Sequence, residues 1–276
     1  ARPPYEQALH GALEPNVMRD TYNTRAFYPR PPAGAPVRGM EVLSRALAER
    51  TPNLHLRTAV EEIDPAARTV TARRDGAPVR YGYAERCLCT LPLPAAMRMC
   101  AGAPGPLRRA AAELRHNVVF TAAFAIRGPR PRSPGLWRYY TDESVPFTRL
   151  IFMTELDPLA APPEGWGVMA EITHPAEAPR PPDAEILAAA RDGLRRVGML
   201  PAGCEVVGQH LLVADPAYVV FTPESQEVVR RCRAFLEEAG ISTVGRYGRW
   251  EYSSMAQVME DGIAWAQARS GAAVPA

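Results

Sequence analysis

The stretch that decides the fold is Gly-Arg-Tyr-Gly-Arg-Trp-Glu-Tyr-Ser-Ser-Met at residues 245–255, followed by Asp-Gly-Ile-Ala-Trp-Ala at residues 261–266. This pattern predicts a short aromatic-rich strand that runs into a helix beginning near Met255. The first backbone N–H groups of a helix have no partner within it, so those of Met255 and Ala256 are available to negative charge. The stretch therefore predicts the rim of an anion-binding site.

Side chains of the same stretch fit this interpretation. Gly245 permits a close backbone approach, and the planar guanidinium of Arg246 suits a diphosphate or another anion. Trp250 and Tyr252 offer flat apolar walls. Spacing alone leaves an alternative open, in which the segment is only an aromatic strand capped by a helix and Arg246 is solvated.

Composition narrows the class of protein. The 276 residues are 47% hydrophobic, enough for one large core or two modest ones, and the net charge of +2 comes without a basic run interleaved with aromatic residues. Nucleic acid is therefore not an expected partner. All 32 basic residues are arginine, which excludes chemistry that needs a lysine in this chain, such as a Schiff base or a P-loop.

The cysteines and histidines offer no metal or triad chemistry. The cysteine count of five is odd and lacks the spacing of a disulfide scaffold, which is typical of a reducing cytoplasm. Cys87 and Cys89 face the same way on a strand, and we interpret them as buried thiols rather than ligands. No segment has the length of a membrane span. The histidines are scattered without the spacing of ligands or of a triad: His10, His55, His116, His174 and His210.

The first hundred residues suggest part of a dinucleotide-binding sheet. A helix is possible from Tyr5 to Val17, before a proline-rich turn region at 28–36 and a helical pattern from Gly39 that stops at Pro52. The next expected elements are a strand over 54–60, a hairpin of 70–74 and 79–83 around Asp75-Gly76, and a buried strand over 87–92. This order of helix, strand, hairpin and buried strand is typical of a dinucleotide-binding sheet in which a small antiparallel hairpin is inserted between parallel strands.

The following region is different in kind. After a helical stretch at 107–115, four strand-like runs have no helix between them, at 118–126, 137–141, 147–153 and 167–172. An amphipathic helix at 183–197, a strand at 206–213 and a helix at 226–239 precede the closing stretch. We expect a mixed α/β fold whose parts are a lead-in at 1–37, a substrate domain at 101–215, and a cofactor-binding domain shared by 38–100 and 216–276.

Three separated segments match one superfamily in its chain order. They are residues 38–63, which include Arg38-Gly39-Met40, the turn Cys89-Thr90-Leu91-Pro92-Leu93-Pro94, and the closing stretch. Together they resemble the flavin-dependent amine oxidase superfamily, which includes monoamine oxidases, protoporphyrinogen oxidases and UDP-galactopyranose mutases. Residues 139–149 and 171–173 look like substrate-domain strands of the mutase-like branch, and Ala217-Tyr218-Val219-Val220 resembles its Ala-Tyr-Pro-Val element.

The resemblance implies FAD and an incomplete Rossmann-like domain of the glutathione-reductase type beside a mainly antiparallel substrate-domain sheet. It implies cofactor contacts from Gly39, Met40, Val60, Thr90, Pro92, Gly245, Arg246, Trp250, Tyr252, Ser254, Met255 and Ala256. It implies substrate contacts from Tyr139, Phe147, Arg149 and Tyr218, on a sheet that also carries Tyr140 and Phe152. The chain departs from the family at Ser254, where Asn or Asp is usual, at Ala256, where Asp is usual, and at Val219, where proline is usual. It also lacks the lysine of many amine-oxidising members.

The family's opening Gly-x-Gly-x-x-Gly turn, which binds the FAD pyrophosphate, is missing from these residues. The one Gly-x-Gly is Gly165-Trp166-Gly167, which we interpret as a hairpin turn. A partner chain could supply the opening half, the chain could be a fragment, or it could be a degenerate non-catalytic relative; we favour the first two. We expect a complementary Rossmann-type polypeptide.

Three functions follow from the resemblance. An oxidoreductase would pass a hydride from a C–N or C–H bond of a small molecule to the flavin. A mutase-like enzyme would use Arg149, Arg246, Tyr218 and Tyr252 to hold a nucleotide-sugar diphosphate without net redox change. A subunit that has lost FAD would have no catalytic role.

Overall fold

The protein folds into two compact units in the computed structural model, which describes residues 28–131 and 135–270. The first unit comprises the residues up to Thr51, Phe120–Thr173 and Arg180–Leu212. The second comprises Pro52–Val119, His174–Pro179 and the residues from Val213 on. The expected helix at Tyr5–Val17 lies outside the described residues, and the proline-rich stretch from Tyr28 consists of turns and irregular backbone.

A five-stranded sheet organises the first unit. Its strand order is β6-β7-β8-β5-β9, and β7 pairs antiparallel with β6 on one side and with β8 on the other. The strands are β5 (His116–Arg127), β6 (Trp137–Tyr139), β7 (Arg149–Phe152), β8 (Gly165–Pro175) and β9 (Glu205–Val219). These confirm the strand-like runs predicted from the sequence, and the long β5 shows the alternating burial of a sheet with one core face.

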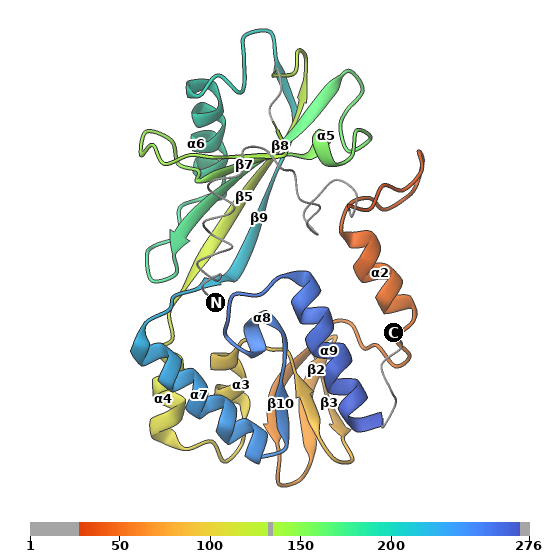
Figure 1. Cartoon of the computed structure of the whole chain (residues 1–276), viewed down its shortest axis with the longest axis vertical. Coiled ribbons are helices and arrows are strands. Elements are labelled where there is room, and N and C mark those ends of the chain that lie inside the picture. The colour runs from red at the N-terminus through yellow and green to blue at the C-terminus, as the bar shows by residue number, and fades with distance from the viewer. Residues whose placement is uncertain (1–27, 132–134, 271–276) are drawn as a thin grey trace, which may run out of the picture. The chain divides into compact units, whose positions relative to one another are not determined.

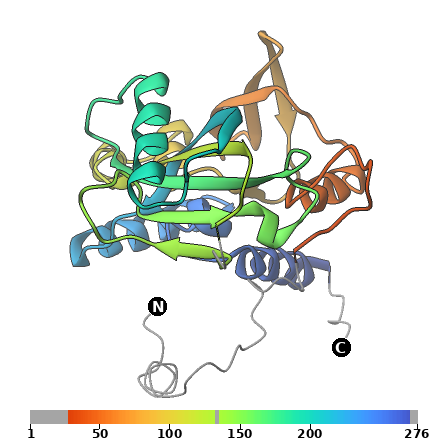
Figure 2. The same ribbon diagram turned by 90° about the horizontal axis from the view of Figure 1, so that it is seen from above.

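Helix α6 (Asp183–Arg196) covers one face of this sheet (Figures 1 and 2). Acidic residues in its first turn and arginines in its last turn complement the helix dipole, and its apolar stripe packs onto the strands. Gly193 permits the contact, because a Cβ there would lie 2.7 Å from Cε1 of Phe147. The core beneath α6 includes Phe124, Phe147, Leu150, Phe152, Trp166, Val168, Ala190 and Leu194.

The second unit contains a separate antiparallel sheet in the order β1-β2-β3. Its strands are β1 (Thr58–Asp64), β2 (Thr69–Arg74) and β3 (Ala77–Gly82). Asp75 and Gly76 both have positive φ, 49° and 85°, which is the backbone of a tight two-residue hairpin turn. The predicted Asp-Gly hairpin is therefore confirmed.

A short parallel pair lies in the core of the second unit. Strand β4 (Cys87–Cys89) pairs with β10 (Ile241–Thr243), and α3 (Leu93–Met99), α4 (Gly105–Ala112) and α7 (Pro223–Glu238) pack around the same apolar cluster. Helix α7 begins with a capping box, in which Thr222 and Ser225 each accept a backbone N–H of the other. The predicted strand before Pro92 is confirmed over Cys87–Cys89, but the prediction that it is buried holds only for Cys89, since Leu88 is exposed.

The chain ends, within its described part, in two helices. The one-turn α8 (Gly245–Gly248) follows β10, and α9 (Met255–Ser270) follows an irregular link (Figure 1). The remaining helices, α2 (Glu41–Glu49) and α5 (Met153–Leu156), belong to the first unit. No helix of the described residues has the length and apolar character needed to cross a membrane.

Two predictions of local structure need correction. The closing stretch is not an aromatic-rich strand: its strand stops at Thr243, and Gly245 starts α8 because its positive φ of 75° turns the chain. The Gly165-Trp166-Gly167 turn is wrong in position, because the turn is at Pro162–Gly165 and Trp166 already lies in β8. The two compact units divide within β5, β8 and β9, and also between residues 51 and 52 and between residues 179 and 180.

Candidate functional site

Two of the three motif segments meet in the second unit. Parallel pairing joins Ile241 to Cys87 and Thr243 to Cys89. The pairing continues one step, since the backbone N–H of Val244 donates to the carbonyl oxygen of Cys89 at 3.2 Å. The start of the closing stretch is thereby fixed beside the turn that contains Thr90 and Pro92.

Gly248 is the glycine that allows the close approach. A Cβ at Gly248 would lie 2.9 Å from the carbonyl oxygen of Cys89 and 3.4 Å from Cα of Thr90. At Gly245 nothing lies within 4 Å of a built Cβ, so that glycine provides the positive φ and leaves open space above it. The sequence pattern assigned the close approach to Gly245 and missed Gly248, although Gly248 was visible as the second glycine of the stretch.

Arg246 is held by two tyrosines. The rings of Tyr218 and Tyr252 stack with centroids 5.9 Å apart and an interplanar angle of 18°. The Cζ atom of Arg246 lies 4.8 Å from the centroid of Tyr218 and 4.7 Å from that of Tyr252. Both distances are in the range of cation–π attraction, so the guanidinium has a fixed position.

Backbone carbonyls hold the same guanidinium. Arg246 donates to the carbonyl oxygen of Ala217 at 3.0 Å and to that of Ser253 at 3.4 Å. Its Nε is buried without a hydrogen-bond partner among the described residues. The positive charge meets no carboxylate at hydrogen-bonding distance in the described chain, which leaves it able to interact with an anion.

The first turn of α9 is capped in part. Ser254 and Gln257 form a reciprocal pair: the N–H of Gln257 donates to Oγ of Ser254 at 3.3 Å, and the N–H of Ser254 donates to Oε1 of Gln257 at 2.8 Å. This engages the hydroxyl of Ser254 at the position where the family usually has Asn or Asp. The backbone N–H groups of Met255 and Ala256 have no acceptor among the described residues.

Trp250 lies in the core of the second unit. It is 3% exposed, and its ring meets that of His116 edge-on at a centroid distance of 5.9 Å. Its position is that of a packing side chain, whereas Tyr252 is 63% exposed. Of the two aromatic residues expected beside a flavin, only Tyr252 presents a large surface in this unit.

The other predicted cofactor residues are spread over both units. Thr90 is exposed, Pro92 is half-buried, and Val60 packs against the core of the second unit. Gly39 and Met40 belong to the first unit, where Gly39 has a φ of 70° and a Cβ would lie 2.9 Å from the hydroxyl of Tyr28. The structure brings together the residues of the closing stretch and of the Cys89–Pro92 turn.

Two thiols of β4 lie beside this site, Cys89 buried and Cys87 half-buried. Burial raises the pKa of the Cys89 thiol to about 11 and also raises the pKa of Cys87, so both stay protonated near neutral pH.

No group of three or more His, Cys, Asp or Glu side chains in the described residues could hold a metal ion.

The sheet of the first unit carries a second group of predicted residues. Arg149 pairs with Glu171, with Nη2 and Oε2 2.5 Å apart, and donates to the hydroxyl of Tyr139 at 3.3 Å. Phe147 is placed differently: it is 1% exposed in the core beneath α6, where its ring contacts Tyr140. Tyr139 and Arg149 therefore lie together, while Phe147 packs on the core side.

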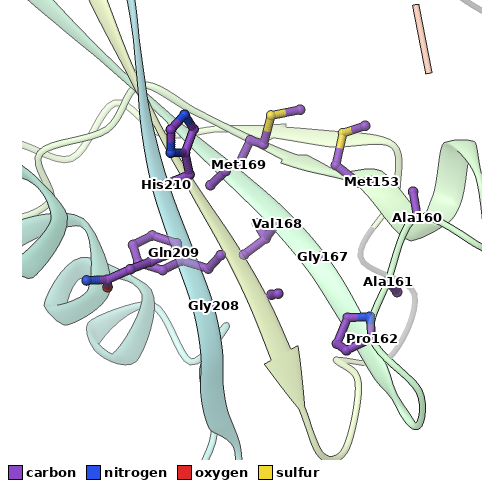
Figure 3. A pocket seen from close by; sticks show the side chains of 13 residues that line it. Met153, Ala160, Ala161, Pro162, Gly167, Val168, Met169, Gly208, Gln209 and His210 are labelled. Atoms are coloured by element: carbon purple, nitrogen blue, oxygen red, sulfur yellow. The ribbon is translucent and has the colours of Figure 1, made fainter. Parts of the chain in front are cut away.

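A hollow lies across strands β5, β8 and β9 of the first unit, beside α5 and the loop that follows it (Figure 3). Its volume is about 520 Å³. The residues that line it are Ala123, Phe124, Ala125, Met153, Ala160, Ala161, Pro162, Gly167, Val168, Met169, Gly208, Gln209 and His210. None of them was predicted as a site residue from the sequence, where the available signal was the set of small residues on neighbouring strands.

The loop that walls this hollow is fixed by a buried ion pair. Asp157, with its side chain 1% exposed, accepts two hydrogen bonds from Arg38, Nε to Oδ2 at 2.8 Å and Nη2 to Oδ1 at 2.9 Å. Arg38 also donates to the carbonyl oxygens of Pro31 and Pro32. The first motif segment thus contributes its arginine to the structure of the first unit.

Comparison with known proteins agrees with these features. A family model described as flavin containing amine oxidoreductase matches residues 6–264. No curated protein sequence matches the chain. Among solved structures, reduced UDP-galactopyranose mutase is similar with a TM-score of 0.70 and 17% identity, over 78% of this chain and 46% of that chain.

Two further structures are similar. A putative protoporphyrinogen oxidase from Exiguobacterium sp. 255-15 has a TM-score of 0.55 and 16% identity, over 83% of this chain and 51% of that one. A CLA-producing fatty acid isomerase from P. acnes has a TM-score of 0.59 and 9% identity, over 84% and 52%. At these identities the likeness concerns the fold. The chain spans about half the length of each of these structures.

Proposed function

The chain belongs to the flavin containing amine oxidoreductase family, and from this premise we propose that it supplies the closing half of the FAD site of an oxidoreductase. The enzyme would transfer a hydride from a C–N or C–H bond of a small molecule to the flavin. The observation that carries the proposal is the convergence of the Cys89–Pro92 turn, the clamped Arg246 and the uncapped first amides of α9 in one unit.

The residues present fit a flavin. The backbone N–H groups of Met255 and Ala256 would donate to an anionic flavin oxygen or phosphate at the positive end of the helix dipole. The open space above Gly245 admits a ligand close to the backbone, and Tyr252 offers an exposed ring. FAD, when bound, supplies the hydride-accepting chemistry, while these residues bind and orient it.

A complementary Rossmann-type polypeptide is part of the proposal. Parallel sheets in proteins usually have several strands, and helices cover both of their faces. In the described chain the parallel sheet consists of two strands, β4 and β10, of three residues each. Helix α9 exposes Met255, Met259 and Ile263, spaced by four residues, to 53%, 40% and 55%. Further strands and a helix from outside these residues would cover both features and bind the pyrophosphate.

One observation favours a second candidate function, that of a mutase-like enzyme acting on a nucleotide sugar. Three of the four residues expected to hold a diphosphate, Arg246, Tyr218 and Tyr252, lie together. The fourth, Arg149, belongs to the first unit and is neutralised by Glu171. This neutralisation makes the oxidoreductase our first choice.

Flavin spectroscopy of the native assembly tests the proposal. We expect FAD to copurify in stoichiometric amount and a substrate to bleach it anaerobically, mole for mole. Activity that appears only after chemical reduction of the flavin would instead identify a mutase. An assembly without flavin would leave the chain as a non-catalytic subunit and would refute the proposal.

An arginine variant with a matched control sharpens the test. Arg246→Gln removes the clamped charge and should weaken FAD retention, whereas Arg45→Gln removes an exposed helical arginine paired with Glu41 and should leave it unchanged. Equal flavin content in the two variants would exclude Arg246 from the cofactor site.

A further inference from the structure

We propose that the hollow across β5, β8 and β9 binds the apolar part of the substrate, and that this substrate is an uncharged or weakly polar small molecule rather than a nucleotide sugar. That the hollow binds an apolar ligand follows from residues of the first unit alone. That this ligand is the substrate of the enzyme rests on the proposed function. The volume of about 520 Å³ lies within the range of about 300–1,000 Å³ typical of small-molecule sites.

Small residues create the hollow, because they leave space where larger side chains would stand. Six of its lining residues are alanine or glycine, namely Ala123, Ala125, Ala160, Ala161, Gly167 and Gly208. A Cβ on Gly167 would lie 3.3 Å from the carbonyl oxygen of Ala160, so the loop passes closely over this strand. A Cβ on Gly208 would lie 3.6 Å from Cβ of Ala125, an ordinary contact, so a larger residue there would fill the space.

The chemistry of the lining selects an apolar ligand. None of the thirteen lining residues carries a permanent charge; Gln209 and His210 are the polar ones. Figure 3 shows Gln209 extending away from Met153 and Met169, which leaves the imidazole of His210 as the polar group on their side. Methionine side chains are flexible and polarisable and adapt to apolar shapes, including aromatic rings.

A diphosphate would lack partners in this hollow. An anion taken out of water needs cationic or strong hydrogen-bond donors to offset its lost hydration. Arg149 of the neighbouring strand β7 is engaged by Glu171 in two contacts, at 2.5 and 2.6 Å. An uncharged ligand needs no such compensation, and His210 can exchange one hydrogen bond with it.

The wall of the hollow is already formed. The Asp157 carboxylate binds Arg38 on one side and the backbone N–H of Leu159 at 3.0 Å on the other. The N–H of Ala160 donates to the carbonyl oxygen of Asp157 at 2.9 Å, and that of Gly165 to Pro162 at 3.1 Å. A preformed wall loses little conformational entropy when a ligand binds.

Fluorescence of the neutral apolar amine N-phenylnaphthylamine measures the site in the native assembly. Gly208→Val fills the hollow and should weaken binding about tenfold or more. The matched control Gly82→Val also places a valine in a strand, at a position where nothing lies within 4 Å of the Cβ, and should bind like the wild type. Uridine diphosphate should not displace the probe.

The outcomes separate this inference from the proposed function. Equal binding by the two valine variants, or displacement by uridine diphosphate, would overturn the inference even if flavin is present. Selective loss in Gly208→Val supports an apolar site even if no flavin is found, in which case only the proposed function fails. In the flavin-loaded assembly, the reducing substrate is a different apolar amine, one with a hydrogen on the carbon next to nitrogen that can pass to the flavin as hydride. Gly208→Val should raise the concentration of this amine needed for half-maximal bleaching at unchanged flavin content; an unchanged concentration would refute the substrate role.

Discussion

The core-facing side of the five-stranded sheet and the outer side of α9 show opposite states of burial. Under α6, Leu150, Phe152 and Trp166 are each less than 2% exposed. On α9, Met255 and Ile263 are more than half exposed, although they repeat at helical spacing as core residues do. The two surfaces are similarly apolar and differ in whether the described chain covers them.

The difference separates an apolar surface that its own unit covers from one that the described residues leave exposed. The sheet face under α6 is packed by its own unit, so its stability is expected to be intrinsic. The stripe on α9 is exposed among the described residues, and the parallel sheet has two strands there, which is why we propose that another polypeptide covers this region. Substitutions should therefore act on folding in the first region and on assembly in the second.

The largest effect is expected from Phe152→Ala in the first unit. Removal of this buried ring leaves a cavity beside Trp166 and should lower the free energy of unfolding by about 3–5 kcal/mol. Urea denaturation followed by circular dichroism measures the loss. Phe152→Leu, which keeps most of the volume, should lose less than about 1.5 kcal/mol; equal losses would show that the ring is not closely packed.

The ion pair at the wall of the hollow ranks second. Arg38→Met leaves the carboxylate of Asp157 buried and should lower the free energy of unfolding by about 2–3 kcal/mol, below the range for a fully buried pair because Arg38 keeps some exposure. The double variant Arg38→Met/Asp157→Leu removes both charges and should recover part of this loss. A double variant less stable than Arg38→Met would contradict the account of this pair.

A third effect concerns the close approach in the closing stretch. Gly248→Ala forces a methyl group against the carbonyl oxygen of Cys89 and should lower the free energy of unfolding by about 1–3 kcal/mol. The control Gly262→Ala, inside α9 with nothing within 4 Å of its Cβ, should raise it by about 0.5–1 kcal/mol. Thermal unfolding of both variants checks whether their effects have opposite signs.

Alkaline pH should weaken the core of the second unit. Burial raises the thiol pKa of Cys89 and of Cys232 from 9.0 to about 11 in the folded chain. The folded state thus favours the neutral thiol, so its contribution is full below pH 9 and is lost as the pH rises through about 11. Cys89→Ala should flatten the dependence of the unfolding free energy on pH between these values; an unchanged slope would contradict the burial of this thiol.

The smallest effect on folding is expected on α9. Ile263→Gln should change the free energy of unfolding of the chain by no more than about 0.5 kcal/mol, because this side chain is already exposed. The same change should reduce the flavin content of the native assembly, whereas the exposed control Glu260→Gln should not. A large loss of stability in the chain alone would show that the stripe is covered within the chain.

Those elements could be predicted from the sequence whose local residue pattern alone determines their backbone conformation or their buried face. Asp75-Gly76 requires positive φ at both positions, and the stripe of 183–197 matches α6 to within one residue at its end. The three co-linear segments also indicated the family correctly.

The remaining features depend on long-range packing that periodicity does not encode. Tyr252 is exposed and Trp250 buried because α8 turns the chain between β10 and α9. Gly248 is needed because its backbone lies against Cys89, a residue 159 positions earlier in the chain. The hollow depends on small residues of three strands that meet only in the folded sheet.

We propose that this chain completes an FAD site without forming one alone. Equilibrium binding of FAD to the purified 276-residue chain, compared with the flavin content of the native assembly, tests it most directly. We expect stoichiometric FAD in the assembly and far less than stoichiometric FAD on the chain alone. Stoichiometric FAD bound tightly by the isolated chain would contradict it.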